Sequence, residues 1–565
     1  MRARRLCFAL CLTSIFAACS PEGSGDPGDG GLDGYAGDSS KRARVFAINP
    51  VTTPEPIEVG LDVGDDVDGK LTSARDAQGI RKLRAFTCVD EGQIVYVMGR
   101  GEQRICTLRQ MADRDADGSF VYEDWDEDLA GRLAPRDLHA EVSVFYHAQR
   151  FYDRITDPAV GVFDMLPGRH ERDGQPVPIN LVANYQLPAH PVARSLAPAA
   201  VAFFIPAEYM AMGMAEVQGL VGFEGDFLVF GQGEQVDFGY DGETVYHEFG
   251  HAVVHATAEL AGVEADPQGL THLGPALNEG LADTFAFLVS ENPQLFAFLD
   301  ARMGGGFALD VREDRTFPAD LCGLDRADAA IISSANWDVL SLLRERAGFD
   351  EPRFLRVLLL TLLRLADAQA WESFAQYADA LLAVLADEGF AEHAPDVRAL
   401  LEERGLYESL RVVELDQTGM LLTGGAGAYA WNTWLERDED GASVRIAPAY
   451  VQLVAVAPAG SIGLRLEITA LRSPMDMGDG ELDLDYLLYL RRGEPVRYES
   501  QQGRRVSVIV DEVRTPDSCE PVDTPLGPGL QLGWILAGLP SEPSYLQLVN
   551  YGSSEGLLFV ERAWD

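Results

Sequence analysis

Positive charge is scarce in this chain of 565 residues: 45 lysines and arginines stand against 89 aspartates and glutamates, a formal net charge of −44. Such a surface repels phosphate backbones, so the composition excludes nucleic acid as a partner and suits an exported protein that must stay soluble. Long apolar runs are also missing beyond residue 18. The stretch 354–365 carries Arg356 and Arg364, so we expect a buried helix there rather than a membrane span.

Cysteine is rare as well, with seven in the whole chain. Beyond the N-terminal segment only Cys88, Cys106, Cys322 and Cys519 remain. An even number in an exported chain suggests disulfides, although four cysteines allow three pairings. We favour Cys88 with Cys106, because both lie in one short β-rich region. Cys322 with Cys519 would then tie the middle of the chain to its C-terminal part.

The N-terminus has the pattern of an export signal. Three arginines (Arg2, Arg4 and Arg5) precede an apolar run at residues 6–18 that is too short to span a bilayer. The run Phe16-Ala17-Ala18-Cys19 resembles a bacterial lipobox, which implies lipidation of Cys19; ordinary secretion is the alternative. Residues 20–42 are rich in Gly, Ser and Asp and predict a flexible tether. We therefore expect an outer-membrane lipoprotein or an extracellular protein.

The most informative motif is His247-Glu248-Phe249-Gly250-His251, an H-E-x-x-H sequence inside a predicted helix at residues 241–261. Histidines four residues apart lie one turn apart on the same helical face, so both rings can reach one metal ion. The apolar positions follow the opposite face, which predicts that this side packs on a core. Glu248 flanks the ligand face, where its carboxylate could hold a metal-activated water and accept its proton.

A third ligand candidate, Glu279, follows 28 residues after His251, in the run Asn278-Glu279-Gly280-Leu281-Ala282-Asp283. Asp283 lies one turn further along, where it could orient a ligating histidine. Three N/O ligands with one open position describe a catalytic zinc site better than a structural one. The alternative is that both segments are ordinary polar helix faces exposed to water.

The residues after the second histidine exclude one subclass of zinc peptidase. A metzincin needs a glycine three residues and a histidine six residues beyond it, and those positions hold Val254 and Thr257. His255 lies one further turn along nearly the same face. Three consecutive turns of one helix cannot converge on a tetrahedral ion, so we expect His255 to pack or support rather than bind metal. A glutamate from a following helix is the gluzincin solution, and Glu279 fits it.

Residues 246–253 and 278–283 together resemble the thermolysin-like and fungalysin-like metallopeptidases. Weaker likeness, in a helix at 140–153, a strand at 227–233 edging the active site and a helix ending near 338, extends it over about residues 130–410. The resemblance implies an α+β fold with two lobes around a Zn²⁺ ion held by His247, His251 and Glu279. It also implies an endopeptidase that hydrolyses protein or peptide substrates with metal-activated water, with Glu248 as base and Asp283 as orienting residue.

Two departures from that family bear on activity. Its members carry a histidine downstream of the third ligand that donates to the oxyanion, whereas only His393, in a predicted late surface helix, follows here. When Trp337 is aligned with the corresponding helix of that family, Arg326 falls near the position of the missing histidine. Arg326 could therefore donate the hydrogen bond to the oxyanion; the alternative is that it is an ordinary surface arginine. Val201 also replaces an asparagine that binds substrate backbone. A zinc-binding, proteolytically weak adhesion protein therefore remains an alternative, although the intact Glu248 favours a peptidase.

The chain divides into a signal peptide (1–19), the tether (20–42), an N-terminal β region (43–130), the metallopeptidase domain (131–410) and a C-terminal β-sandwich (411–565). Residues 480–490 loosely resemble pre-peptidase C-terminal domains, which implies substrate or surface binding. Asp113, Asp115 and Asp117 echo the opening of a Ca²⁺ loop, but Asp124 stands at the place of the usual glutamate. An acidic turn explains them more simply. We expect a monomer.

Overall fold

The structure is a computed structural model that describes most of the chain from residue 41 onward. The predicted signal peptide, Cys19 and nearly all of the predicted tether lie outside the described residues. Within the described part, no helix is both long and apolar enough to cross a membrane. The described residues are 41–65, 67–75, 82–97, 101–122, 137–162, 171–172, 175–188, 195–209, 225–258, 260, 264–368, 373–415, 420–423, 434–437, 443–472, 483–502, 505–524, 527–552, 554 and 556–564.

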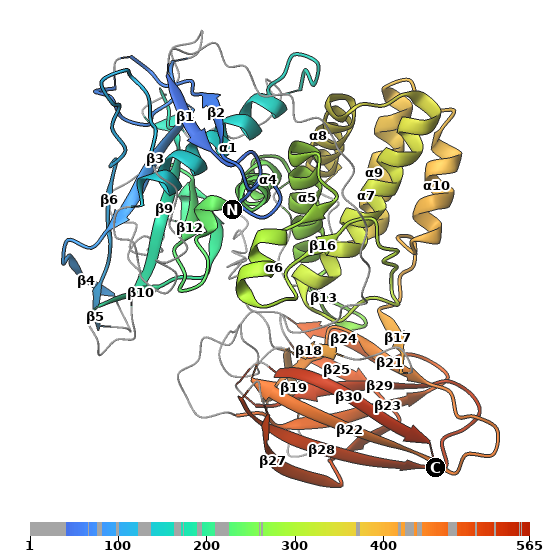
Figure 1. The fold of residues 1–565 in the computed structure, drawn as a ribbon. Helices are drawn as coiled ribbons and strands as arrows, with labels where there is room; N and C mark the ends of the chain where they lie inside the picture. Colours follow the sequence, from blue (N-terminus) through green and yellow to red (C-terminus); the bar gives the residue numbers. More distant parts are fainter. Residues whose placement is uncertain are drawn as a thin grey trace.

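The N-terminal part is built around a mixed β-sheet of order β11-β12-β9-β3-β6, with β10 beside β9 (Figure 1). The inner strands β12, β9 and β3 run parallel, whereas β11 and β6 are antiparallel to their neighbours. α1 (Leu138–Ile155) packs on β3 and β9, and the Asp137 side chain caps its first turn by accepting two backbone hydrogen bonds. The strands are β3 (Leu83–Val89), β6 (Thr107–Arg109), β9 (Ile179–Pro188), β10 (Leu196–Pro198), β11 (Ala202–Ile205) and β12 (Phe227–Gly231).

This sheet crosses the boundary predicted at residue 130, so residues 43–130 do not form a separate β region. β3 lies before the boundary and pairs in parallel with β9 after it, from Leu83 opposite Ile179 to Thr87 opposite Ala183. Parallel neighbours need a long crossover, here through α1, and no local pattern shows which distant strands will pair. The predicted helix and strand are present as α1 and β12. However, the sequence predicts that the strand now seen as β12 lies at the edge of the active site. In the structure β12 is an inner strand, and its neighbour β11 forms that end of the sheet within the described residues.

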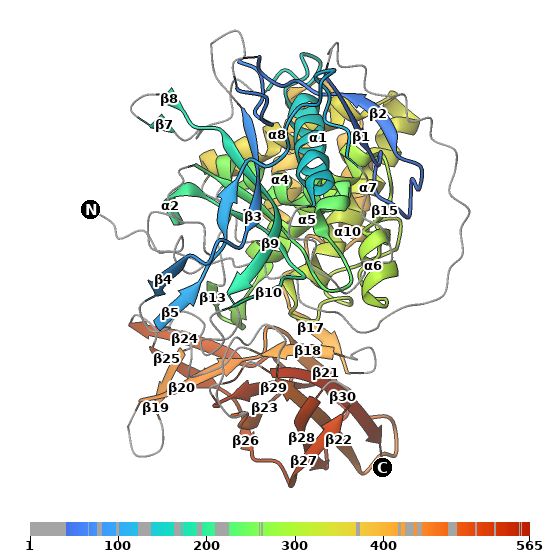
Figure 2. The same cartoon turned by 60° about the vertical axis from the view of Figure 1, so that its left-hand side comes forward.

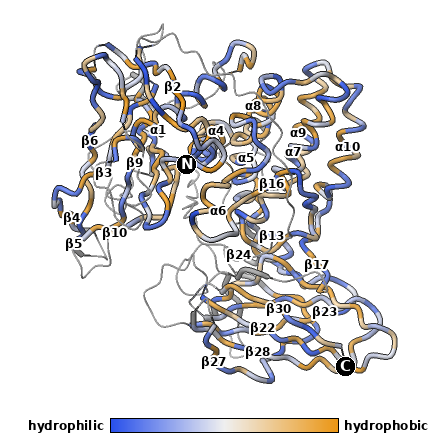
Figure 3. The backbone as a smooth tube through the Cα atoms, in the orientation of Figure 1, coloured by the Kyte–Doolittle hydropathy of each residue, from blue (hydrophilic) through white to orange (hydrophobic). Residues whose placement is uncertain are grey.

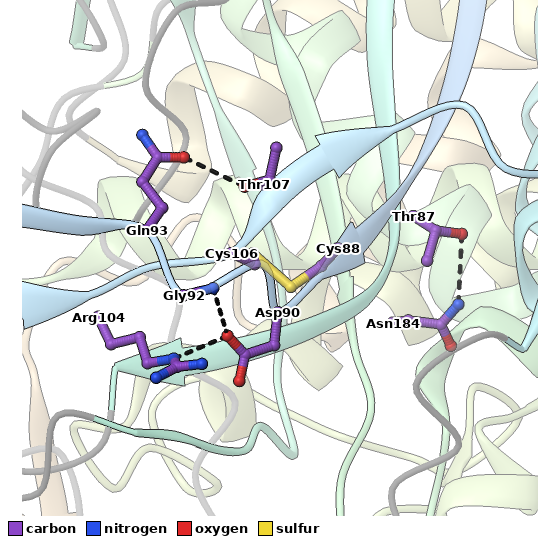
Figure 4. Close-up of a disulfide and its surroundings, with 9 residues drawn as sticks. All are labelled: Thr87, Cys88, Asp90, Gly92, Gln93, Arg104, Cys106, Thr107 and Asn184. Atoms are coloured by element: carbon purple, nitrogen blue, oxygen red, sulfur yellow. Dashed lines mark hydrogen bonds and ion pairs between the residues drawn. A yellow bond between two sulfur atoms is a disulfide. The ribbon is translucent and has the colours of Figure 1, made fainter.

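Cys88 and Cys106 form the predicted disulfide, which joins β3 to the residue before β6 (Figure 4). Beside it, Asp90 accepts hydrogen bonds from the Arg104 side chain and the Gly92 backbone. The second predicted pairing is wrong, because Cys322 and Cys519 are not bonded to each other. Cys322 precedes α7 (Asp325–Ala347), whereas Cys519 lies exposed in β27 (Ser518–Thr524), the outermost strand of a C-terminal sheet. The even number of cysteines suggested this second bridge, but it does not indicate whether two cysteines lie close together in the fold.

Helices dominate the middle of the chain. α4 (Gly242–Thr257) packs against α5 (Leu273–Ser290), and α7 packs against α5 in turn. The later helices are α8 (Glu351–Ala368), which includes the helix predicted at residues 354–365, α9 (Phe374–Asp387) and α10 (Ala394–Glu403). α4 ends at Thr257, whereas the predicted helix runs to residue 261, which lies outside the described residues.

Short elements connect these parts. They are the helices α2 (Ala207–Tyr209), η4 (Phe238–Tyr240) and α6 (Ala297–Met303), and the strand pairs β1 (Arg42–Val45) with β2 (Ile57–Gly60), β4 (Ile94–Val97) with β5 (Gly101–Arg104), β7 (Glu171–Arg172) with β8 (Gln175–Pro176), β13 (Glu264–Asp266) with β14 (Gly269–Thr271), and β15 (Gln294–Leu295) with β16 (Leu309–Asp310). The β13–β14 hairpin stands between α4 and α5 in the sequence.

From residue 412 the chain forms two β-sheets in the region where the sequence predicts a C-terminal β-sandwich (Figures 1 and 2). One has the order β17-β21-β29-β20-β19-β25-β24, with β23 on β29 and β26 on β23; the other has the order β18-β30-β22-β28-β27. The leucines Leu464 and Leu466 of β22 and Leu546 and Leu548 of β29 are all buried in the hydrophobic core. Hydrophobic and hydrophilic positions alternate along these strands (Figure 3). The strands are β17 (Val412–Glu414), β18 (Met420–Thr423), β19 (Trp434–Arg437), β20 (Ser443–Pro448), β21 (Gln452–Ala455), β22 (Gly463–Arg472), β23 (Tyr486–Arg492), β24 (Arg497–Gln502), β25 (Arg505–Ile509), β26 (Glu512–Arg514), β28 (Gly527–Ala537), β29 (Ser544–Asn550) and β30 (Gly556–Trp564), besides β27.

Candidate metal centre

Two glycines let the helices around the site approach with their backbones almost in contact. A Cβ atom on Gly250 of α4 would lie 2.9 Å from Cα of Ala282 in α5. A Cβ atom on Gly280 of α5 would lie 2.6 Å from Cβ of Ile332 in α7. Both distances are shorter than real Cβ contacts, so any larger residue would force the helices apart. This close packing of α4 on α5 brings the histidines of one helix to Glu279 of the other.

His247, His251 and Glu279 form the only cluster of potential metal ligands found among the described residues. Nε2 of His247 lies 3.0 Å from Nε2 of His251 and 3.3 Å from Oε2 of Glu279, and Nε2 of His251 lies 3.5 Å from Oε1 of Glu279. A tetrahedral zinc ion with bonds of about 2.0–2.2 Å requires its ligand atoms to be roughly 3.3–3.6 Å apart. The two distances to Glu279 fall in this range, and the distance between the two Nε2 atoms is shorter, so a bound ion would move the histidine rings slightly apart. All three residues are buried.

The second nitrogen of each histidine meets a hydrogen-bond acceptor. Nδ1 of His247 lies 2.9 Å from Oδ1 of Asp283, and Nδ1 of His251 lies 3.2 Å from Oδ1 of Asn278. Because carboxylate and amide oxygens only accept, both Nδ1 atoms donate a proton to them, and the Nε2 atoms are the nitrogens that face the cluster. Asp283 thus has the contact that the sequence predicted. Asn278 was not predicted as the partner of His251, although it directly precedes the third ligand.

Arg326, near the start of α7, lies against the same cluster. Its Nη1 atom lies 2.9 Å from Nε2 of His247, 3.1 Å from Oε2 of Glu279 and 3.0 Å from Oδ1 of Asp283. The guanidinium carbon lies 4.6 Å from the centre of the Phe296 ring. Burial disfavours the charged form, but Asp283 and Glu279 outweigh it and raise the pKa of Arg326. The interpretation of Arg326 as a plain surface residue is therefore wrong: it is a fixed cation in contact with the candidate ligands.

Glu248 is a buried carboxyl group beside the ligands. Burial raises its pKa to about 7; Glu279 adds to the rise, while His251, Arg326 and a hydrogen bond from the Phe204 backbone of β11 oppose it. Its Oε2 atom is buried and has no hydrogen-bond partner among the described residues. A buried acceptor in that state is suited to receive a proton or a water molecule.

Glu279 differs from Glu248 in its charge state. Burial acts to raise the pKa of Glu279, but His251 and His247 outweigh burial and hold it well below the usual range. Glu279 is therefore ionised at neutral pH. The cluster combines one carboxylate with two imidazoles whose Nε2 atoms face it, which is a donor set that zinc accepts once both Nε2 atoms are deprotonated.

The remaining residues singled out from the sequence are not part of the cluster. Nε2 of His255 pairs with Oε1 of Glu208 at 2.6 Å, which agrees with a packing role rather than metal binding. His393 immediately precedes α10. Val201 precedes β11, and β11 lies against α4.

The predicted calcium ligands do not come together. Asp115 accepts hydrogen bonds from the backbone of Asp117 and Ser119, and Asp113 pairs with Lys70. Asp113, Asp115 and Asp117 form no metal-ligand cluster within the described part of the chain, and Asp124 lies outside it. Turn formation and an ion pair account for these acidic residues, so the Ca²⁺ prediction is not supported.

One buried pair, formed by His272 and Asp328, was not predicted from the sequence. Nε2 of His272, the residue before α5, contacts Oδ2 of Asp328 in α7. Asp328 also accepts hydrogen bonds from the backbone N–H groups of Cys322 and Gly323. Because 56 residues separate His272 from Asp328, no rule of local spacing would find the contact.

No protein-family model matches the chain. No curated protein matches it in sequence either. Its function must therefore be inferred from the geometry and chemistry of the centre formed by His247, His251 and Glu279.

Proposed function

We propose that the chain is a zinc-dependent endopeptidase, and that its mixed and helical parts correspond to the two lobes of thermolysin-like and fungalysin-like metallopeptidases. The observation that carries the proposal is the convergence of His247, His251 and Glu279 from two helices, with Glu248 buried beside them. Structural zinc sites use four protein ligands, whereas catalytic sites use three and keep one position open for water or substrate. A cluster of three candidate ligands supports a site of the second kind.

His247, His251 and Glu279 would hold the ion, which when bound lowers the pKa of water to about 7 and polarises the scissile carbonyl. Glu248 accepts a proton from the attacking water at Oε2, which has no hydrogen-bond partner in the described part of the chain, and delivers it to the leaving amine. Asp283 keeps the His247 ring in the tautomer that presents Nε2 to the ion.

Arg326 supplies the donor that the related enzymes take from a histidine. Glu279 and Asp283 hold its Nη1 atom at 3.1 Å and 3.0 Å, so the guanidinium is fixed before substrate arrives. The contacts with the cluster all come from Nη1, which leaves Nη2 and Nε to donate to a substrate oxygen. As the peptide carbonyl is attacked, its oxygen gains negative charge, and a positioned cation stabilises that charge.

We further propose that the enzyme works outside the cytoplasm as a monomer, either anchored to the outer membrane by a lipid on Cys19 or secreted. The Cys88–Cys106 disulfide supports this location, since disulfides persist in oxidising compartments. The substrate class is protein or peptide.

Hydrolysis of casein by the mature protein tests the proposed activity. Wild-type protein should hold one zinc ion and cut casein, and Glu248→Gln should lose activity while keeping its zinc. Glu403→Gln, which removes an exposed carboxylate of α10, should behave as wild type. A wild-type protein that binds zinc and cuts nothing would instead favour a surface zinc-binding or adhesion protein.

A further inference from the structure

The hairpin between the two metal-binding helices is held by the C-terminal sheets (Figure 1). At its turn, the Pro267 carbonyl accepts a hydrogen bond of 2.9 Å from the Tyr498 backbone. The Gln268 carbonyl accepts two more, of 3.2 Å and 3.3 Å, from the side chains of Gln452 and Gln547. Both glutamines are only 1 % exposed. Buried amide groups used in this way fix the position of the turn, because an unpaired polar group would be costly.

Arg411, the residue before β17, is the strongest single link. It is 2 % exposed and forms a two-pronged ion pair with Asp266 of β13. Its remaining donors reach the carbonyls of Leu270 in β14 and Tyr450 in the C-terminal domain, each at 3.0 Å. Its own backbone N–H donates to the Gln268 side chain at 2.8 Å. A buried, two-pronged arginine pair fixes both distance and direction.

The same contact region continues into the helices of the metal centre. His272 ends the hairpin and begins α5, and its ring lies 4.9 Å from the ring of Tyr450. His272 also contacts Asp328, two residues after Arg326 in α7. Glu279 follows His272 by about two helical turns on the same rigid helix. The C-terminal domain therefore touches the segment that sets where α5 starts relative to α4.

We infer that Arg411 is a positioning residue for the metal centre, and that the C-terminal sheets are part of its framework rather than only a separate binding module. By holding the β13–β14 hairpin, they fix the spacing between the helix of His247 and His251 and the helix of Glu279. This inference rests on the proposed function in that the ion is taken to be zinc. Zinc tolerates displacements of only a few tenths of an ångström in the positions of its ligand atoms. Loss of the contacts between Arg411 and the β13–β14 hairpin should therefore weaken zinc binding.

The test compares zinc affinity in full-length variants, by competition with a chromophoric chelator. Arg411→Ala and Gln268→Ala should each weaken zinc binding about tenfold, in the range found when supports of metal ligands are removed. Gln268→Ala removes only the side-chain links to Arg411 and to the Ser409 carbonyl, so it decides the question if Arg411→Ala fails to fold. The absorption spectrum of Co²⁺-loaded protein should shift in the same variants.

Arg404→Ala is the matched control. Arg404 is also buried, at 5 % exposed, but its partners are Asp338, Asp314 and nearby carbonyls in the helical part. This variant should lose stability and keep wild-type zinc affinity in its folded fraction. Folded Arg411→Ala or Gln268→Ala protein with wild-type affinity would overturn the inference, and so would an equal loss in Arg404→Ala. A wild type that binds zinc but cuts no casein would defeat only the proposed activity, and the affinities would still decide this inference.

Discussion

The carboxylate of Asp283 lies 2.9 Å from Nδ1 of His247, so α5 supports a candidate ligand of α4 from behind. Asp283→Ala removes the carboxylate that accepts the hydrogen bond from Nδ1 of His247. The His247 ring is then free to rotate, and its Nε2 atom becomes a weaker metal ligand. We expect zinc affinity to fall about 10- to 100-fold, measured by chelator competition. Asn278→Ala should cost less, because the amide is a neutral acceptor at a longer distance of 3.2 Å. Unchanged affinity in Asp283→Ala would show that the contact does not support the site.

Gly250→Ala separates two opposite expectations for stability. In a helix free of neighbours, this change stabilises by about 1 kcal/mol. Here the new methyl group would lie 2.9 Å from Cα of Ala282, and overpacking of this kind costs about 1–3 kcal/mol. We therefore expect a lower free energy of unfolding in urea, together with weaker zinc binding. A more stable variant with normal zinc affinity would contradict the close packing of α4 on α5.

Arg326→Ala should lower kcat for peptide hydrolysis about 100-fold, the usual effect of removing one oxyanion donor. KM should change much less, because the donor acts mainly as charge develops on the substrate oxygen. Arg326→Lys keeps the charge but not the planar fork, so activity should be recovered only in part. Steady-state kinetics on a defined peptide, with zinc content checked in each variant, measure this. Wild-type kcat in Arg326→Ala would remove the residue from the mechanism.

The raised pKa of Glu141, a residue outside the metal-ligand cluster, makes the stability of the fold depend on pH. Its carboxylate is buried in α1 and accepts hydrogen bonds from Thr87, Met111 and Ala112, and burial raises its pKa from 4.5 to about 7. The folded state therefore holds a proton that the unfolded chain releases, so this stabilisation is complete below about 4.5 and is lost as the pH rises to about 7.

Glu141→Gln removes that titration. Relative to wild type, the variant should gain stability between pH 4.5 and 7, by at most about 3 kcal/mol. Urea unfolding at pH 5 and pH 8 gives the difference. Glu403→Gln, at an exposed carboxylate, should show no such trend. A stability difference for Glu141→Gln that is the same at both pH values would contradict the raised pKa.

The local parts of the metal centre were predictable from the sequence. His247 and His251 follow from their spacing on one helix, and Asp283 follows from its place one turn beyond Glu279. These relationships depend only on helical periodicity, which a sequence displays directly. Asn278 directly precedes Glu279, so a role near the metal centre could have been suspected from the sequence. Its partner, His251, could not be identified without knowing how α4 packs on α5.

The long-range parts were not predictable in this way. The parallel pairing of β3 with β9 and the contact of Arg411 with Asp266 join residues far apart in the chain. The incorrect pairing of Cys322 with Cys519 shows the same limit. It was inferred from the even number of cysteines, and that number does not reveal where β27, the strand of Cys519, lies in the fold. Which distant segments meet is decided by burial of the whole core, and no single spacing encodes it.

Anomalous diffraction at the zinc edge, from crystals of the zinc-loaded protein, tests the central claim most directly. We predict one strong peak about 2.0–2.2 Å from Nε2 of His247, Nε2 of His251 and a carboxylate oxygen of Glu279. No peak at this position, or a peak with the Glu279 carboxylate outside bonding distance, would contradict the assignment of a catalytic zinc centre.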